Sequence, residues 1–483
     1  MAPERFTEFA ALFSGISNGF TFGIGTGYMS MSLLGSFSDD PHRPFNLTST
    51  QLGSLGGATN LSAPFGSFLG GFVAAMFGRK RIMFLLLFPM ACGWVIIGTA
   101  KSFTAMYFGR LLCGFAQGIR STSTSTYVSE TSKPKVSHAA SKLLKKLPNT
   151  TQHNNIMNFL EIVGAVLNWK FMAFVNALAP FVFLPLIAYT PESPIWLLSK
   201  GRKEEAYRSL QRLRGERTDV EPEFVSMAQH MEKEGRTLKS WRDIFSDWDY
   251  IRPVLLLVPM IILRNCTGWM AIQSYSLSIF QTAGSGSISP RIAAITLGSI
   301  QFLVFLCSGY AMDKFGRKRI SLYSSVIMGV SEIALGTAFY MQTRESYAGV
   351  REHLPWISLT SMMVAMSAYA LGVGGMHTVL VNELIPVQIK SHATGIMNAF
   401  NQFINFLILQ TYFIISERVK PYGVFWMYGS SCFGLALFAI HLLPETKGQS
   451  IMEIERRLTK SNLRTFNEEL ECSTTEKCKP GLK

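Results

Sequence analysis

Uncharged amide side chains interrupt stretches of the chain that are otherwise apolar. Gln301 lies in one such stretch, and Asn401 and Asn405 lie in another, four residues apart and therefore on one face of a helix. Amides in an apolar environment need hydrogen-bond partners, which a solute rich in hydroxyl groups can supply. Hydrogen bonds between helices are the alternative. The three residues are candidates for a binding site or for helix contacts.

The chain lacks the patterns that are typical of an enzyme or a metal site. The sequence contains no Gly-Lys-Ser or Gly-Lys-Thr phosphate loop, no cluster of metal ligands and no nucleophile beside a base. We therefore predict that the protein is not an enzyme and needs no metal or cofactor. Of the seven cysteines, five lie in apolar stretches and two in the C-terminal tail, so no disulfide framework is expected.

The elements that carry the polar residues are predicted to be membrane helices. Of 483 residues, 48% are hydrophobic and 16% are charged, a balance that is rare in soluble proteins of this length. Stretches of about 20 apolar residues can cross a bilayer. They lie at 7–33, 51–77, 82–100, 104–128, 169–190, 252–281, 290–312, 318–341, 355–382, 392–416 and 422–443. A twelfth span is doubtful.

The formal net charge of +14 raises the question of nucleic-acid binding. Lys and Arg gather in short connectors and one central loop, and not in a continuous groove, so we predict no nucleic-acid partner. The positive-inside rule places the connectors at 79–81 and 317–319, the loop at 191–250 and both termini in the cytoplasm. The sequon at Asn46 would then lie outside, where we predict glycosylation.

One phrase occurs twice in the chain. MFGRKRIM at 76–83 and DKFGRKRIS at 313–321 each join two apolar runs about half a chain apart, which indicates two related halves. The charged central loop has the spacing of amphipathic helices. We predict the following units: a six-helix bundle at 1–190, linker helices at 191–250, a second bundle at 251–443 and a cytosolic tail at 444–483.

On these motifs the chain resembles the sugar porters of the major facilitator superfamily, and most of all the arthropod facilitated trehalose and hexose transporters. The resemblance spans nearly the whole chain. It rests on Gly109-Arg110 with Gly114 and Gly118, on Glu130, and on the segments at 191–198 (PESPIWLL), 313–319, 383–390 and 444–455 (PETKGQSIMEIE). It implies an all-α integral membrane protein with twelve transmembrane helices in two six-helix bundles, located in the plasma membrane.

The resemblance also implies two clusters of charged side chains at the cytosolic helix ends. Ion pairs that form when the carrier faces outward and break when it faces inward would make a bistable gate. The first cluster would hold Arg79, Arg110, Glu130 and Glu192, and the second Asp313, Arg317, Glu383 and Lys390. The alternative is that these charges only fix the topology. Ala75 stands where the family has Asp, and Ser137 stands where it has Arg.

The binding site that the resemblance implies is altered in this chain. Where the family has two Gln followed by Ser-Gly-x-Asn, span seven reads RNCTGWM at 264–270. Asn265 and Thr267 could still bind a hydroxyl group, whereas Arg264 is foreign to a neutral sugar pocket. In span ten, GVGGMHT at 372–378 replaces a Pro-rich break and a ring-stacking Trp, and Thr378 is a further candidate ligand.

Spans one and five also depart from the family pattern. The polar segment at 133–155 leaves a fifth helix that would begin near Pro148 and end near 168, without the family's sugar-binding Gln. In span one, Gly25 stands where proton-coupled relatives carry an acid, which favours facilitated diffusion. We predict a carrier for a neutral sugar, trehalose or a hexose. The alternatives are a transport-dead sugar sensor and a non-functional splice or gene-model variant; the oligomeric state is not readable.

Overall fold

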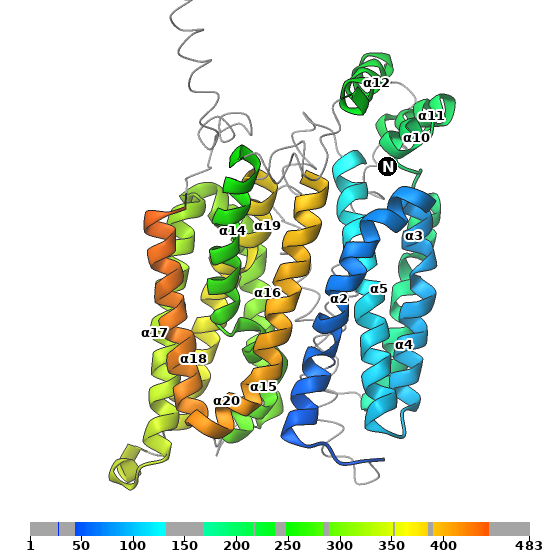
Figure 1. Ribbon diagram of the computed structural model, residues 1–483. Helices are drawn as coiled ribbons and strands as arrows, with labels where there is room; N and C mark the ends of the chain where they lie inside the picture. The colour runs from blue at the N-terminus through cyan, green and yellow to red at the C-terminus, as the bar shows by residue number, and fades with distance from the viewer. Residues whose placement is uncertain are drawn as a thin grey trace, which may run out of the picture.

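The computed structural model describes Tyr28 and residues 44–131, 168–215, 218–236, 248–283, 289–350, 353–384 and 390–443. Every regular element within these ranges is a helix, which confirms the all-α class. The expected spans one and five fall outside the described residues, apart from Tyr28. Figure 1 shows the long helices running side by side, with shorter helices across one end.

The first group of helices carries the expected spans two, three, four and six. Thr48 begins the first helix with a capping box: its hydroxyl accepts from the Gln51 N–H at 3.3 Å, and the Gln51 side chain accepts from the Thr48 N–H at 3.1 Å. The helices are α2 (Ser49–Phe77), α3 (Arg79–Leu85), α4 (Leu87–Thr99), α5 (Phe103–Thr131), α8 (Trp169–Leu178), the 3₁₀ turn η2 (Ala179–Phe183) and α9 (Leu184–Tyr189).

Glycines allow α2 and α5 to pack closely. A methyl group added at Gly114 would overlap the Thr59 carbonyl oxygen, and one at Gly118 would overlap the carbonyl oxygen of Ala63. Small residues at one-turn spacing permit such close backbone contact between membrane helices. The glycines at this helix pair therefore serve packing.

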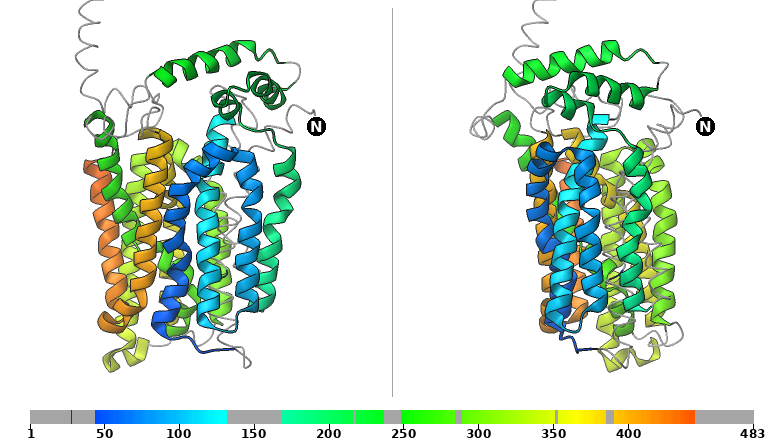
Figure 2. Two further views of the ribbon diagram at one scale, coloured as in Figure 1. Left: turned by 45° about the vertical axis from the view of Figure 1, so that its right-hand side comes forward. Right: turned by 90° about the vertical axis from the view of Figure 1, so that its right-hand side faces the viewer.

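Three linker helices lie across one end of the bundle, which we call the linker end (Figure 2): α10 (Pro194–Ser199), α11 (Lys203–Arg214) and α12 (Glu221–Arg236). Arg214 fixes them to the membrane helices. Its guanidinium pairs with Glu223 at 2.7 Å and donates to the Thr131 carbonyl oxygen at 2.9 Å, although its side chain is almost fully buried. The expected helical linker is confirmed.

The second group carries spans seven to twelve. Its elements are α14 (Trp248–Cys266), α15 (Trp269–Thr282), α16 (Pro290–Phe315), α17 (Arg317–Gln342), η3 (Glu345–Val350), α18 (Leu354–Ala368), the π-helical turn η4 (Tyr369–Val373), α19 (Gly374–Leu384) and α20 (Lys390–His441). The last of these holds two expected spans. Lys420 has a φ of +68° just before Pro421, and the helix kinks there.

Seven helices in the described part of the chain are long and apolar enough to cross a membrane. They are Thr50–Phe77, Arg79–Thr99, Trp169–Tyr189, Leu255–Thr282, Arg317–Gln342, Leu354–Met376 and Gly395–His441. Large apolar side chains such as Phe65, Phe72 and Val330 are more than half exposed on them, as lipid contact requires. The protein is a multi-pass membrane protein. The division into four units at the expected boundaries stays a prediction.

Candidate functional site

A helix break in span seven positions the first group of candidate residues. Gly268 has a φ of +68°, and a side chain at this position would collide with the ring of Tyr428. Only glycine fits this left-handed conformation and this contact. The Thr267 hydroxyl donates back to the Arg264 carbonyl oxygen at 2.7 Å, so Thr267 supports the break and does not point to a solute.

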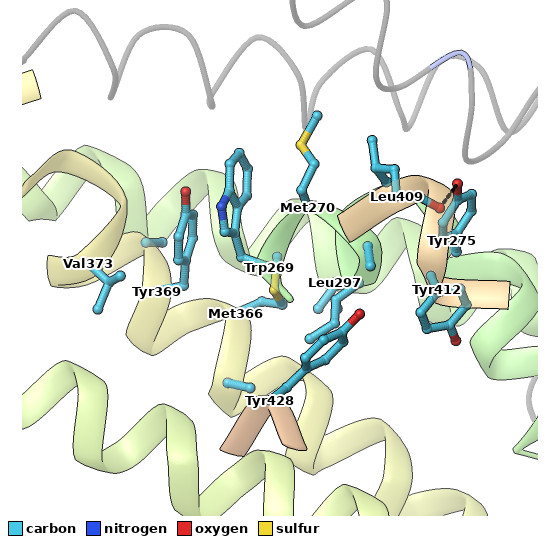
Figure 3. Close-up of a cluster of buried hydrophobic side chains, with 14 of the residues drawn as sticks. Trp269, Met270, Tyr275, Leu297, Met366, Tyr369, Val373, Leu409, Tyr412 and Tyr428 are labelled. Carbon is cyan, nitrogen blue, oxygen red and sulfur yellow. Dashed lines mark hydrogen bonds between the residues drawn. The ribbon is translucent and has the colours of Figure 1, made fainter. Parts of the chain in front are cut away.

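The break brings Arg264 against two aromatic rings. Trp269 and Tyr369 stack with ring centroids 4.7 Å apart (Figure 3), and the Arg264 guanidinium carbon lies 5.0 Å from the Trp269 ring and 5.6 Å from the Tyr369 ring. Aromatic faces attract a desolvated cation. A buried cation is therefore tolerated at this point of the membrane domain.

Hydrogen bonds occupy the Arg264 guanidinium. Nη2 donates to the Tyr369 hydroxyl at 2.6 Å and to the Gly374 carbonyl oxygen at 3.3 Å, and Nε donates to the Val373 carbonyl oxygen at 3.2 Å. The π turn η4 ends at Val373, and π turns often occur at functional sites. Every one of these acceptors is uncharged. Within the described residues, no carboxylate lies at ion-pair distance from Arg264.

Asn265 and Asn401 meet beside this arginine. The Asn265 amide donates to the Asn401 side-chain oxygen at 2.9 Å and accepts from Trp269 Nε1 at 3.2 Å. Arg264 Nη1 approaches both asparagine oxygens, at 3.4 and 3.5 Å. These two predicted ligands are thus brought together, and they bond to each other across α14 and α20.

Gln301 and Asn405 keep buried amide oxygens without a partner among the described residues. Both side chains are 2% exposed, and Gln301 Oε1 and Asn405 Oδ1 accept no hydrogen bond there. Asn405 only donates to Gln402 at 3.3 Å. A buried acceptor left unpaired costs free energy, so a hydroxyl donor in this region would stabilise it. For Thr378 the structure describes the backbone of α19 only.

The second group of candidate residues lies at the linker end. Glu192 Oε1 accepts from the backbone N–H groups of Arg79 and Lys80 at 3.0 and 3.1 Å. Gly78, with a φ of +98°, turns the chain into this contact, and a side chain there would strike the Glu192 carboxylate. The Gly-led basic turn is thus held by the first carboxylate of the PESP motif.

Glu130 joins the same cluster from the end of α5. Arg79 Nη2 pairs with Glu130 Oε1 at 2.7 Å, and the Ser193 hydroxyl donates to Glu130 Oε2. Burial raises the pKa of the Glu130 carboxyl, and the nearby Arg79 and Ser193 only partly oppose this shift. We call Arg79, Glu130, Glu192 and Ser193 the gate cluster, after the role that the family resemblance predicts. The sequence does not indicate Ser193, although it follows Glu192 directly, because its contact with Glu130 depends on the fold.

Trp196 adds a contact to the cluster that the sequence did not indicate. Its Nε1 donates to the Ala75 carbonyl oxygen at 2.9 Å, and Tyr127 donates to the Pro191 carbonyl oxygen at 2.8 Å. A backbone acceptor at position 75 is thus engaged where the family pattern has an acid. The Trp196 indole thus joins α10 to α2, and the Tyr127 phenol joins α5 to the segment just before α10.

The placement of Arg110 in this cluster is wrong. Arg110 and Glu130 lie on the same helix α5, 20 residues apart, and a rise of 1.5 Å per residue separates them by about 30 Å. Arg110 is instead buried toward the opposite end, 5.8 Å from the ring of Tyr28. It cannot bond to carboxylates at the linker end.

Of the four side chains in the second predicted cluster, the structure describes only that of Arg317. Gly316 precedes Arg317 with a φ of +89° and a ψ of 157°, close to the φ of +98° and ψ of 153° at Gly78. The repeated sequence therefore folds into a repeated turn. The side chains of Asp313, Glu383 and Lys390 lie outside the described part, so this cluster stays a prediction.

Asn46 is exposed before α2, and its glycosylation also stays a prediction.

Comparison with known proteins agrees with the membrane-helix architecture described above. The family model described as "Sugar (and other) transporter" matches residues 7–458. The chain belongs to this sugar transporter family. It is 30% identical over 462 residues to the facilitated trehalose transporter Tret1 of Bombyx mori, covering 95% of this chain and 88% of the relative. Against Tret1 of Apis mellifera ligustica the identity is 29% over 464 residues, with 94% and 89% covered.

Solved structures agree on the fold of this sugar transporter family member. The major facilitator proton:xylose symporter XylE bound to 6-bromo-6-deoxy-D-glucose superposes with a TM-score of 0.74 at 21% identity, covering 94% of this chain and 99% of that one. The inward-open xylose transporter XylE from E. coli gives 0.72 at 20% identity, with 93% and 99% covered. These structures show the major facilitator fold, and the family that matches the chain is a transporter family and not an enzyme family.

Proposed function

We propose that this chain carries a neutral sugar, trehalose or a hexose, across the plasma membrane by facilitated diffusion. One observation carries the proposal: Gln301 and Asn405 hold buried amide acceptors without a described partner, in a chain of the sugar transporter family. Sugar hydroxyl groups are donors that match such acceptors. The trehalose transporters among its relatives support the choice of sugar.

The gate cluster supports alternating access. Arg79, Glu130 and Glu192 join α3, α5 and the start of the linker by an ion pair and two backbone bonds. A set of charge contacts that closes one end and breaks on opening gives two discrete states. We place the linker end and both termini in the cytoplasm, in line with the excess of Lys and Arg there. Gly25, in place of an acid, supports uncoupled transport.

Uptake of labelled trehalose and glucose, in cells that lack their own carriers, tests the proposal. Surface protein is quantified in parallel because the segment at 133–155 is unusually polar. Saturable uptake that a proton uncoupler leaves unchanged is the expected result. Uptake that collapses with the uncoupler would contradict facilitated diffusion. Surface protein without uptake would favour the sensor, and absence from the surface would favour the non-functional variant.

A sugar acid is a second candidate cargo, favoured by Arg264. This buried guanidinium meets only uncharged acceptors in the described residues, and its Nη1 bonds of 3.4 and 3.5 Å to Asn265 and Asn401 are long. A carboxylate could replace both with shorter, charge-assisted bonds. Unlabelled glucuronate added to the uptake assay distinguishes a sugar acid from a neutral sugar as the cargo. If glucuronate inhibits uptake more strongly than unlabelled glucose does, the acid is favoured. If it inhibits uptake more weakly, the neutral sugar is favoured.

A further inference from the structure

A basic cavity lies between the membrane helices and the linker. Its volume is about 800 Å³, and it is bounded by α3, the end of α9, and α10 with α11. Figure 2 shows these linker helices lying over the α3 end of the bundle. Its basic lining comprises Lys80, Arg81, Arg202, Arg208 and Arg212.

The cavity carries surplus positive charge. Five basic side chains and two carboxylates line it. Both carboxylates are engaged: Glu192 accepts backbone N–H groups of α3, and Glu205 accepts from Arg202 Nε at 2.8 Å. In the described part of the chain, no carboxylate pairs with Arg81 or Arg212. Several arginine guanidinium groups that lie close together are suited to bind phosphate oxygens, because each can donate two parallel hydrogen bonds.

The apolar side of the cavity identifies the source of the phosphate. Phe84 and Leu85 line it and are 38% and 52% exposed, and Phe88, one turn further along the same span, is 50% exposed. This strip continues onto the face of α3 and α4 that meets the hydrocarbon of the bilayer. A soluble phosphate would make no contact with this apolar strip, whereas the acyl chains of a lipid would cover it.

We propose that this cavity binds the headgroup of an anionic phospholipid, with the acyl chains lying along α3 and α4. The site is separate from the proposed sugar site. It adjoins the gate cluster, because Glu192 lines the cavity and accepts from the backbone N–H of Lys80, which also lines it. A bound headgroup would cross-link α3 to α11 and stabilise the closed arrangement of the linker end.

Binding of a fluorescent short-chain phosphatidylinositol bisphosphate to the full-length protein, in a neutral detergent, tests the site. The variant Arg81→Gln/Arg212→Gln removes the two cavity cations that pair with no described carboxylate, and we expect roughly tenfold weaker binding. Lys200→Gln/Lys203→Gln is the matched control. It removes two exposed cations of the same linker that do not line the cavity, and binding should stay unchanged.

Three results would overturn the proposal. Equal losses in both double variants would indicate unspecific attraction to a basic linker. An unchanged affinity in Arg81→Gln/Arg212→Gln would exclude the cavity. Inositol trisphosphate binding as tightly as the short-chain lipid would make the ligand a soluble phosphate and remove the role of the apolar strip. The melting midpoint without lipid checks folding, and Arg208→Gln, a single exposed cavity cation, replaces the double variant if folding fails.

Discussion

At the residue scale, the polar side chains inside the membrane domain divide into two groups. Asn265, Asn401 and Thr267 bond to the protein itself, around Arg264. Gln301 and Asn405 keep amide oxygens that accept no hydrogen bond from the described residues. Because an unpaired buried acceptor is unfavourable until a donor arrives, the second group is better suited to bind a solute. The first group is better suited to hold α14, α15 and α20 together.

Replacing Asn405 by Ala should raise the KM for the transported sugar roughly fivefold to tenfold, since one hydrogen bond is worth about 1–1.5 kcal/mol. Sugar uptake at varied concentration measures this. Thr411→Ala is the control: its half-buried hydroxyl on the same helix donates only to carbonyl oxygens of α20, so KM should not change. An unaltered KM in Asn405→Ala would remove Asn405 from the binding site.

At the element scale, the two Gly-led turns set where α3 and α17 begin. Gly78 and Gly316 share a backbone conformation that residues with a Cβ rarely adopt, although 238 positions separate them. The turn at Gly78 also leaves room for the Glu192 carboxylate. The duplicated sequence motif therefore specifies the backbone conformation of the turn. The basic side chains lie at the linker end because they follow this turn directly.

Gly78→Ala should lower the free energy of unfolding by about 1–3 kcal/mol, because the new methyl group is strained at this φ and meets Glu192. The melting midpoint in detergent reports this change. Gly71→Ala is a matched control on α2, since no atom lies within 4 Å of the added methyl group. Equal midpoints in the two variants would show that the turn tolerates a side chain.

At the scale of the whole molecule, the gate cluster is a candidate for controlling which end is open. Arg79 and Glu130 are 13% and 12% exposed and 2.7 Å apart, and the PESP motif joins both to the linker. We propose that this pair stabilises the closed state, so that removing it would shift the population of states without touching the sugar.

Arg79→Gln and Glu130→Gln should each lower the maximal uptake rate and leave sugar binding intact. The double variant should be little worse than either single one, which corresponds to a coupling energy of about 0.5–3 kcal/mol. Uptake rates, with sugar-induced shifts of the melting midpoint, measure both quantities. Glu221→Gln on α12 removes an exposed carboxylate and should transport normally. Additive losses in the double variant would contradict the gate.

The helical class, the approximate ends of the described spans and the paired basic turns follow from the sequence alone. Apolar length and turn residues act locally, so spans such as 51–77 were predicted close to the observed Ser49–Phe77. The meeting of Arg79 with Glu130 and Glu192 came from family resemblance. The separation of Arg110 from Glu130 is readable from the sequence, since 20 residues of helix imply a distance of about 30 Å.

Which polar groups find hydrogen-bond partners depends on how the helices pack in three dimensions. Arg264 bonds to η4, a segment more than a hundred residues away, and Trp196 bonds to α2 across 121 residues. The cavity beside α3 likewise needs α11 packed over it. Such contacts depend on how helices pack against one another, and hydropathy and spacing along a single helix contain no information about the partner. The physical reason is that the burial and pairing of a polar group depend on the helices packed against it, whereas the length of a span depends only on the residues of that segment.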